Sequence, residues 1–107
     1  PPINMRTLVI PPAVQRDDDA IQMITAWIAE NGLHCTLNIG MWHAQGHDET
    51  KAWGILLADI IRHVAQAVEK ERGIPAEETI RVITASLLDE LDDPTSEAKG
   101  DFSPGDS

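Results

Sequence analysis

Two periodicities meet in the middle of this chain and predict its central elements. Between residues 33 and 42, apolar and polar side chains alternate, which is typical of a strand with one buried face. The apolar positions are Leu33, Cys35, Leu37, Ile39 and Met41. After a polar loop, apolar side chains recur every three or four residues, at Trp53, Leu56, Leu57, Ile60, Ile61, Val64 and Val68. This spacing predicts an amphipathic helix from about residue 50 to residue 72, closed by Gly73.

The flanking segments predict three more elements. Thr7–Ile10 is a short β-prone run stopped by two prolines, which favours an edge strand. Asp17–Asp19 has the residues of a helix start and Asn31-Gly32 those of a helix end, so the segment between them is predicted to be helical. A third helix is predicted from Pro75 to Pro94, with its inner face at Ile80, Ile83, Leu87, Leu88 and Leu91.

These elements follow one another in the order β-α-β-α-α and predict a single α+β domain over residues 1–94. We expect a small antiparallel sheet packed by three helices. Residues 95–107 are rich in Gly, Ser, Pro and acidic residues, and this composition predicts a disordered acidic tail.

Two strands are too few for an independent sheet, which points to assembly of two copies. Ile55 lies about opposite Trp53 on the helical wheel, so the first turns of the long helix are apolar on both sides. We therefore expect a homodimer, in which a second copy completes the sheet. The dimer is expected to bury Ile55, Trp42 or the strand from Leu33 to Trp42.

The charge of the chain restricts its partners. The 107 residues include 18 acidic and 8 basic side chains, for a net charge of -10. Phosphate binding draws on clustered Lys and Arg, and no basic run is present, so we expect neither nucleic acid nor an anionic membrane as partner. An acidic surface instead favours a basic protein partner, or it serves only to keep the protein in solution. The single cysteine, the absence of a signal-like start and the lack of an apolar run of about 20 residues predict a cytoplasmic protein.

Histidines and carboxylates near the central loop raise the question of a metal site. His43 and His47 lie in one loop beside Asp48 and Glu49, and Asp59 and His63 are one helical turn apart. However, no known metal-binding spacing is present, and Asp59 with His63 is better explained as a surface ion pair. We expect no metal and no cofactor.

Nucleophilic catalysis finds little support in the sequence. Cys35 shares the apolar strand face, whereas His34 points to the opposite face, so Cys35 is expected to be a small buried hydrophobic residue. The polar strand face is more promising, because His34, Thr36 and Asn38 stand in a row that ends at Trp42. A ligand site there would use His34, Asn38, Trp42 and His63, although a solvated face or a dimer contact explains the row as well.

Two Trp-containing stretches resemble a family of short bacterial proteins that is catalogued as a domain of unknown function. The first stretch runs from Asn31 to Trp42, and the second from Ala52 to Asp59, followed by Arg62-His63. The resemblance covers residues 8 to 93 and implies a bacterial cytoplasmic protein. It implies no activity, cofactor or site residue.

Together these observations favour a small protein that is not an enzyme, a dimeric interaction or structural module. The alternative is a small-ligand-binding protein or minor enzyme that uses the polar face of the 33–42 strand.

Overall fold

A three-stranded sheet and a pair of long helices make up most of the computed structural model, which describes residues 6–95 and the backbone of residues 99–104. The elements are α1 (Pro12–Arg16), β1 (Ile24–Ala29), β2 (Gly32–Ile39), α2 (Met41–Ala44), α3 (Glu49–Arg72), α4 (Ala76–Asp92) and β3 (Lys99–Pro104). The α+β class and the antiparallel strand pair are confirmed. The order of the elements differs from the expected β-α-β-α-α at both ends of the chain.

The segment before Asn31-Gly32 is a strand, so the predicted helix over residues 17–31 is wrong. β1 pairs with β2 antiparallel, from Ile24 opposite Leu37 to Ala29 opposite Gly32. Glu30 and Asn31 have φ angles of 50° and 62°, which makes them a two-residue hairpin loop with the twist that adjoining strands require. Asn31-Gly32 therefore ends a hairpin turn and does not end a helix.

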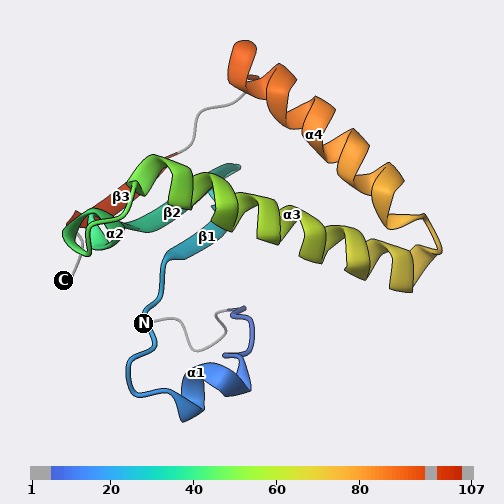
Figure 1. Cartoon of the computed structure of the whole chain (residues 1–107). Helices are drawn as coiled ribbons and strands as arrows, with labels where there is room; N and C mark the ends of the chain where they lie inside the picture. Colours follow the sequence, from blue (N-terminus) through green and yellow to red (C-terminus); the bar gives the residue numbers. More distant parts are fainter. Residues whose placement is uncertain (1–5, 96–98, 105–107) are drawn as a thin grey trace.

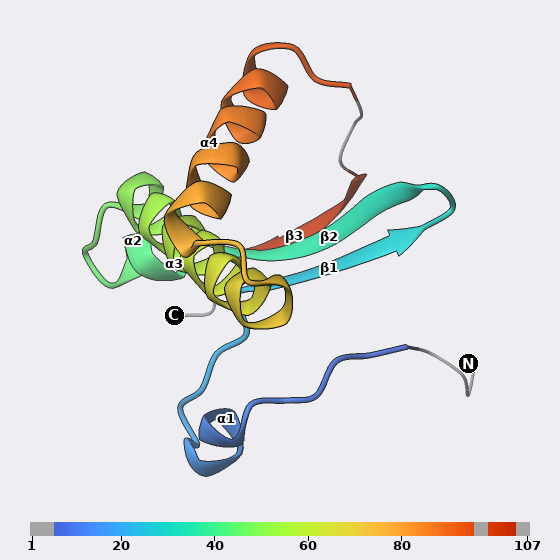
Figure 2. The same cartoon turned by 90° about the vertical axis from the view of Figure 1, so that its right-hand side faces the viewer.

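The N-terminal region also differs from its prediction. Thr7–Ile10 is not a strand, and the helix α1 comes before the aspartates, with Asp17 as its C-terminal cap. The Asp17 carboxylate accepts a hydrogen bond from the Asp19 N–H at 2.9 Å, which folds the three aspartates into a local turn. Figures 1 and 2 show this N-terminal segment apart from the sheet and the long helices.

β2 is the central strand, because β3 pairs with its other edge in parallel register, from His34 opposite Lys99 to Ile39 opposite Pro104. The expected disordered tail therefore contains a strand at Lys99–Pro104. The prediction for residues 96–98 and 105–107 lies outside the described residues. The expectation of only two strands in one copy is wrong.

β2 ends at Ile39, three residues before the predicted strand end at Trp42. Gly40 has φ 100°, a left-handed conformation that favours glycine, and it turns the chain directly into α2. The side chains of Met41 and Trp42 consequently belong to a helix and leave the strand alternation.

The two long helices agree with their predictions. α3 begins at Glu49 with Asp48 as its cap, whose carboxylate accepts from the Lys51 N–H at 3.2 Å, and it ends at Gly73 with φ 73°. α4 packs against α3 as the second arm of a V (Figure 1). Of its predicted inner face, Ile80, Ile83 and Leu87 are half-buried, whereas Leu88 and Leu91 are 58% and 73% exposed.

Candidate functional site

A cluster of hydrogen bonds at the corner between α2 and α3 is centred on the Glu49 carboxylate. Glu49 accepts two bonds from the Gly40 N–H, at 3.1 and 3.0 Å, and one from the His43 N–H at 3.2 Å. Its Oε2 also accepts from the Trp53 indole N–H at 2.9 Å. One side chain thus satisfies backbone donors at the start of α2 and ties them to α3.

The Trp53 ring also contacts Trp42 from the side. The two ring centroids are 5.5 Å apart and the planes lie at 88°, an edge-to-face pair. Because Trp42 is on α2 and Trp53 is on α3, the pair and the Glu49 bonds fix the angle between these helices.

The electrostatics of this corner favour the charged form of Glu49. The Gly40 N–H, followed by the Trp53 indole N–H, holds the pKa of Glu49 below its ordinary value of 4.5. Asp48 next to it also has a lowered pKa, because the Thr50 hydroxyl and the Lys51 N–H donate to its carboxylate.

A lowered folded-state pKa makes the contribution of Glu49 dependent on pH. Its contribution to stability is complete above the pKa of the unfolded chain and is lost as pH falls through the folded-state pKa. We expect Glu49→Gln to destabilise the protein at pH 7 and to cost less at an acidic pH below the lowered pKa of Glu49, where the wild-type carboxyl is protonated as well. Urea denaturation of both proteins at the two pH values measures the difference. An equal cost at both pH values would contradict the assignment.

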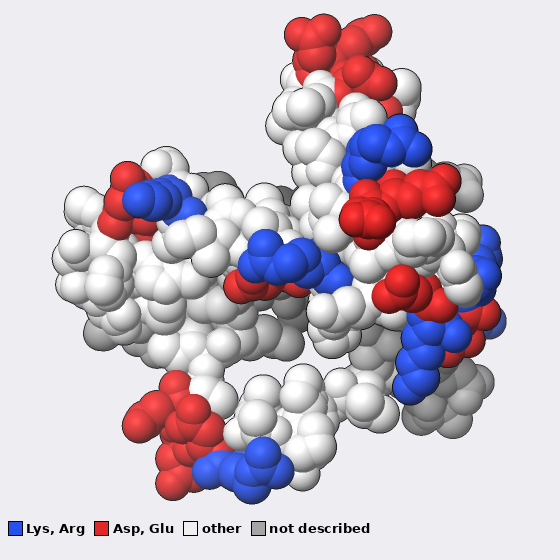
Figure 3. Space-filling view, turned by 45° about the vertical axis from the view of Figure 1, so that its right-hand side comes forward, with Lys and Arg blue, Asp and Glu red and all other residues white. Residues whose placement is uncertain are grey.

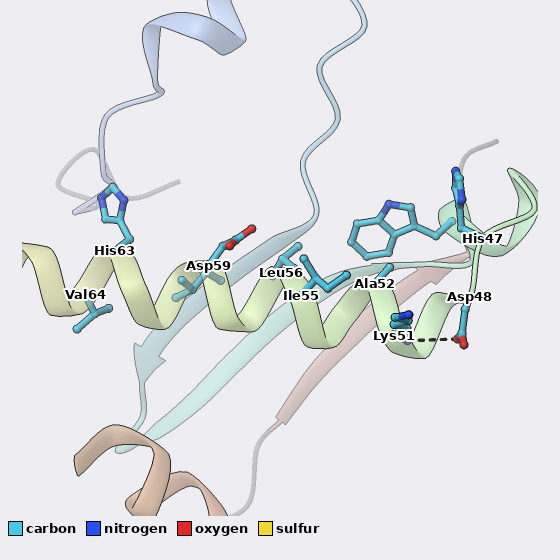
Figure 4. A pocket seen from close by; sticks show the side chains of 11 residues that line it. His47, Asp48, Lys51, Ala52, Ile55, Leu56, Asp59, His63 and Val64 are labelled. Carbon is cyan, nitrogen blue, oxygen red and sulfur yellow. Dashed lines mark hydrogen bonds between the residues drawn. The ribbon is translucent and has the colours of Figure 1, made fainter. Parts of the chain in front are cut away.

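An open groove begins at Trp42 and follows one side of α3. Its volume is about 880 Å³. The groove is lined by Trp42, His47, Asp48, Lys51, Ala52, Ile55, Leu56, Asp59, Ile60, His63 and Val64. From Asp48 onward these residues recur every three or four positions, so they form one stripe along the helix (Figure 4). Ala52, Ile55 and Leu56 form an apolar stretch in the stripe, and titratable side chains lie on both sides of it.

The structure divides the four residues of the predicted ligand site between two surfaces. Trp42 and His63 both line the groove, at its two ends. His34 and Asn38 lie on β2, on the face that β1 shares through Thr25 and Trp27, and neither lines the groove. Asn38 Oδ1 is buried and has no hydrogen-bond partner among the described residues.

The residues considered for a metal site or for nucleophilic chemistry are also dispersed. Within the described residues, no group of three or more His, Cys, Asp and Glu side chains could hold a metal ion. Asp59 pairs with Arg62 on the exposed helix surface, where an ion pair with His63 was expected. Cys35 is half-buried and shares a sheet face with Leu33 and Leu37.

Sequence reasoning missed Glu49 and the groove for different reasons. Glu49 was considered only as a loop carboxylate, although its place at the first turn of α3, four residues before Trp53, offered the signal. The groove was missed because Ile60 and Val64 were assigned to the buried face of the amphipathic helix, but each is 41% exposed.

Two clusters of acidic side chains lie outside the groove. Figure 3 shows them at the far end of α4 and beside α1, and charged side chains of both signs lie on the surface between them. The α4 cluster comprises Asp89, Glu90, Asp92 and Asp93, and the other comprises Asp17–Asp19. Within the described residues, no helix has the length and hydropathy that crossing a membrane requires.

Comparisons with known proteins place this architecture among relatives. No curated protein matches the chain. A solved structure from the photosynthetic bacterium Rhodopseudomonas palustrus CGA009, described as a "putative pyruvate dehydrogenase", is similar with a TM-score of 0.67 and 27% identity. The match covers 91% of this chain and 94% of that one. A family model for a domain of unknown function, DUF5076, matches residues 7–95, and the chain therefore belongs to this family.

Proposed function

We propose that the protein is a homodimeric interaction module of the bacterial cytoplasm whose two copies meet along α3. The observation that carries this proposal is the lack of a core in one copy. Among the residues whose side chains the structure describes, only Met41 and Ala65 are buried. A chain with this many apolar residues is stable only if a second surface covers them.

The size of the exposed surface leads to the same conclusion. The chain exposes 9156 Å², whereas a compact monomer of 11.7 kDa exposes about 5,900 Å². Its radius of gyration is 16.0 Å, against about 13 Å for a compact domain of this length. The excess of roughly 3,000 Å² is more than one partner of a standard interface buries, about 800 Å². An obligate dimer is consistent with such an excess.

The charge pattern of α3 favours a second copy as the occupant of the groove. Ile55 is 56% exposed, and Lys51 lies four residues before it and Asp59 four residues after it. A two-fold axis through Ile55 would run the two α3 helices antiparallel and bring each Lys51 opposite Asp59 of the other copy. Ile55 would then meet its own symmetry mate, with an ion pair on each side.

This arrangement predicts a charge-reversal rescue. Lys51→Glu would place two carboxylates opposite each other, and Asp59→Lys would place two ammonium groups opposite each other. The two-fold axis makes each repulsion occur twice, so each variant should weaken the dimer by about tenfold. The double variant restores opposite charges and should recover wild-type affinity. Light scattering across a dilution series measures the dissociation constant.

A matched control is Lys70→Glu, which makes the same charge change near the C-terminal end of α3, outside the groove. It should leave the affinity unchanged. A wild-type mass of 11.7 kDa at micromolar concentration would contradict the dimer. A double variant as weak as the single ones would contradict the axis at Ile55.

Beyond the dimer, the acidic clusters at the ends of the molecule favour a basic protein partner.

A second candidate function is the binding of a small ligand in the groove. Pyruvate is a ligand to test, because the similar Rhodopseudomonas structure is described as a "putative pyruvate dehydrogenase". The groove's volume of about 880 Å³ and the presence of Trp42 and His63 support small-ligand binding. Trp fluorescence distinguishes the two: a bound metabolite such as pyruvate should change the emission of wild-type protein, whereas a protein-binding module should not respond.

A further inference from the structure

The N-terminal arm, defined here as residues 6–10, is an apolar segment that its own chain leaves uncovered. Leu8 is 95% exposed and Val9 is 90% exposed. The arm is extended and forms no strand, and Pro11 and Pro12 separate it from the body of α1. Within the described part of the chain, only the Ile10 carbonyl of this backbone accepts a side-chain hydrogen bond, from Gln15 Nε2 at 3.4 Å. A run of Thr, Leu, Val and Ile in this state has strong β propensity and no strand to pair with.

The outer edge of β1 is a strand edge to which the arm could pair. The sheet order is β1-β2-β3, so β1 has a strand on one side only among the described residues. The Asn38 N–H donates to the Met23 carbonyl at 2.9 Å, which directs the backbone of alternate residues toward β2. The N–H and C=O groups of Ile24, Ala26 and Ile28 therefore point to the free edge, and Ile28 is 82% exposed. Free edges of this kind accept an added strand.

The arm and the free edge lie on the side of the molecule where the α3 groove opens. Figures 1 and 2 both show the N-terminal segment below the sheet, beyond β1. In Figure 4, His63 and Asp59 point toward that same side. A second copy seated on the groove therefore approaches the arm and the edge as well. The family match also begins at residue 7, so the arm is part of the shared domain.

We infer that the arm of each copy adds as a fourth strand to the outer edge of β1 in the second copy. This inference rests on the proposed dimer and names a further contact within it. Each chain carries both the donor segment and the acceptor edge, so one two-fold axis satisfies both copies at once. The exchange pairs the edge amides of β1, and because successive side chains of a strand alternate between faces, it places one of Leu8 and Val9 on the sheet face of Ile28.

The arm is assigned to the partner because its own chain holds it away from the sheet. α1 and the turn at Asp17–Asp19 lie between the arm and β1 along the chain. In this arrangement Leu8 and Val9 remain almost fully exposed.

Amide hydrogen exchange tests the added strand. In the wild-type dimer, the Ala26 and Ile28 amides should exchange slowly, although no strand of their own copy pairs with them. Val9→Pro removes a backbone donor and disfavours pairing on both sides, so these amides should exchange about tenfold faster. The matched control is Val9→Thr, which keeps the β-branched shape and the N–H, and it should retain the protection. Unprotected edge amides in a wild-type dimer would overturn the inference.

A spin label shows which copy supplies the arm. In a Cys35→Ser background, Arg6→Cys carries a nitroxide on one chain, which is mixed with unlabelled, isotope-enriched wild-type chain. Exchange between copies predicts broadening of the Ala26 and Ile28 amides of the enriched chain. Broadening seen only when label and isotope are on the same chain would overturn the inference. A dimeric mass with either negative result leaves the proposed function intact, whereas a monomeric mass removes both.

Discussion

Ile55→Asp is expected to convert the dimer into monomers. With the two-fold axis through this position, the introduced carboxylate would face its own symmetry copy in the middle of the apolar stripe. Removing a central apolar contact and burying like charges costs several kcal/mol, so the dissociation constant should rise by at least about 100-fold. Light scattering and sedimentation at micromolar concentration measure the change in mass.

Val82→Asp is the matched control for this substitution. Val82 is 52% exposed on α4, close to the 56% of Ile55, and it does not line the groove. The same change from an apolar side chain to a carboxylate should therefore leave the mass unchanged. If Ile55→Asp remained dimeric, the α3 groove would not be the dimer contact.

Trp53→Ala is expected to have the largest effect on folding stability. The substitution removes the edge-to-face contact with Trp42 and the indole donor to Glu49, and it leaves a gap between α2 and α3. Truncation of a fully buried Trp costs about 3–5 kcal/mol, and for this half-buried ring we expect about 2–3 kcal/mol. The melting temperature should fall by about 10 °C.

Trp53→Phe separates the two contributions of the indole. It keeps an aromatic ring against Trp42 but cannot donate to Glu49, so it should cost only about 1 kcal/mol. Urea denaturation of all three proteins at one fixed concentration gives the comparison, because dimerisation makes stability depend on concentration. Equal losses for the two variants would show that the hydrogen bond, and not the packing, holds the corner.

The long helices could be predicted because their signals are local. The apolar spacing of α3 and the left-handed Gly73 that closes it act within one or two turns of chain, and the structure has both. The strand β2 follows equally from its alternation. In these elements, local preference and tertiary packing favour the same structure.

The hairpin shows where local signals were insufficient. Met23, Ile24, Trp27 and Ile28 fit one face of a helix, but Ile24, Ala26 and Ile28 equally fit one face of a strand. The pairing with β2 decides between these readings, and it depends on contacts that the segment's own sequence does not contain. β3 was missed for the same reason, since its composition alone favours disorder.

The candidate site was predicted only in part. Ile55 was identified from the helical wheel, and the groove includes it together with Trp42 and His63. The spacing of Glu49 and Trp53 indicated one partner of Glu49, but its donors at Gly40 and His43 could not be predicted, because they come into reach only when Gly40 turns the chain.

The parallel pairing of β2 with β3 has a consequence for the route by which the chain folds. β1 and β2 are neighbours in sequence, so their hairpin can close while the remainder is still being synthesised. The second side of β2 must wait until α2, α3 and α4 have left the ribosome, since its partner follows all three. During that interval the second edge of β2 is unpaired in the nascent chain and can pair with a wrong strand. The need for a chaperone should therefore be highest before β3 has been synthesised.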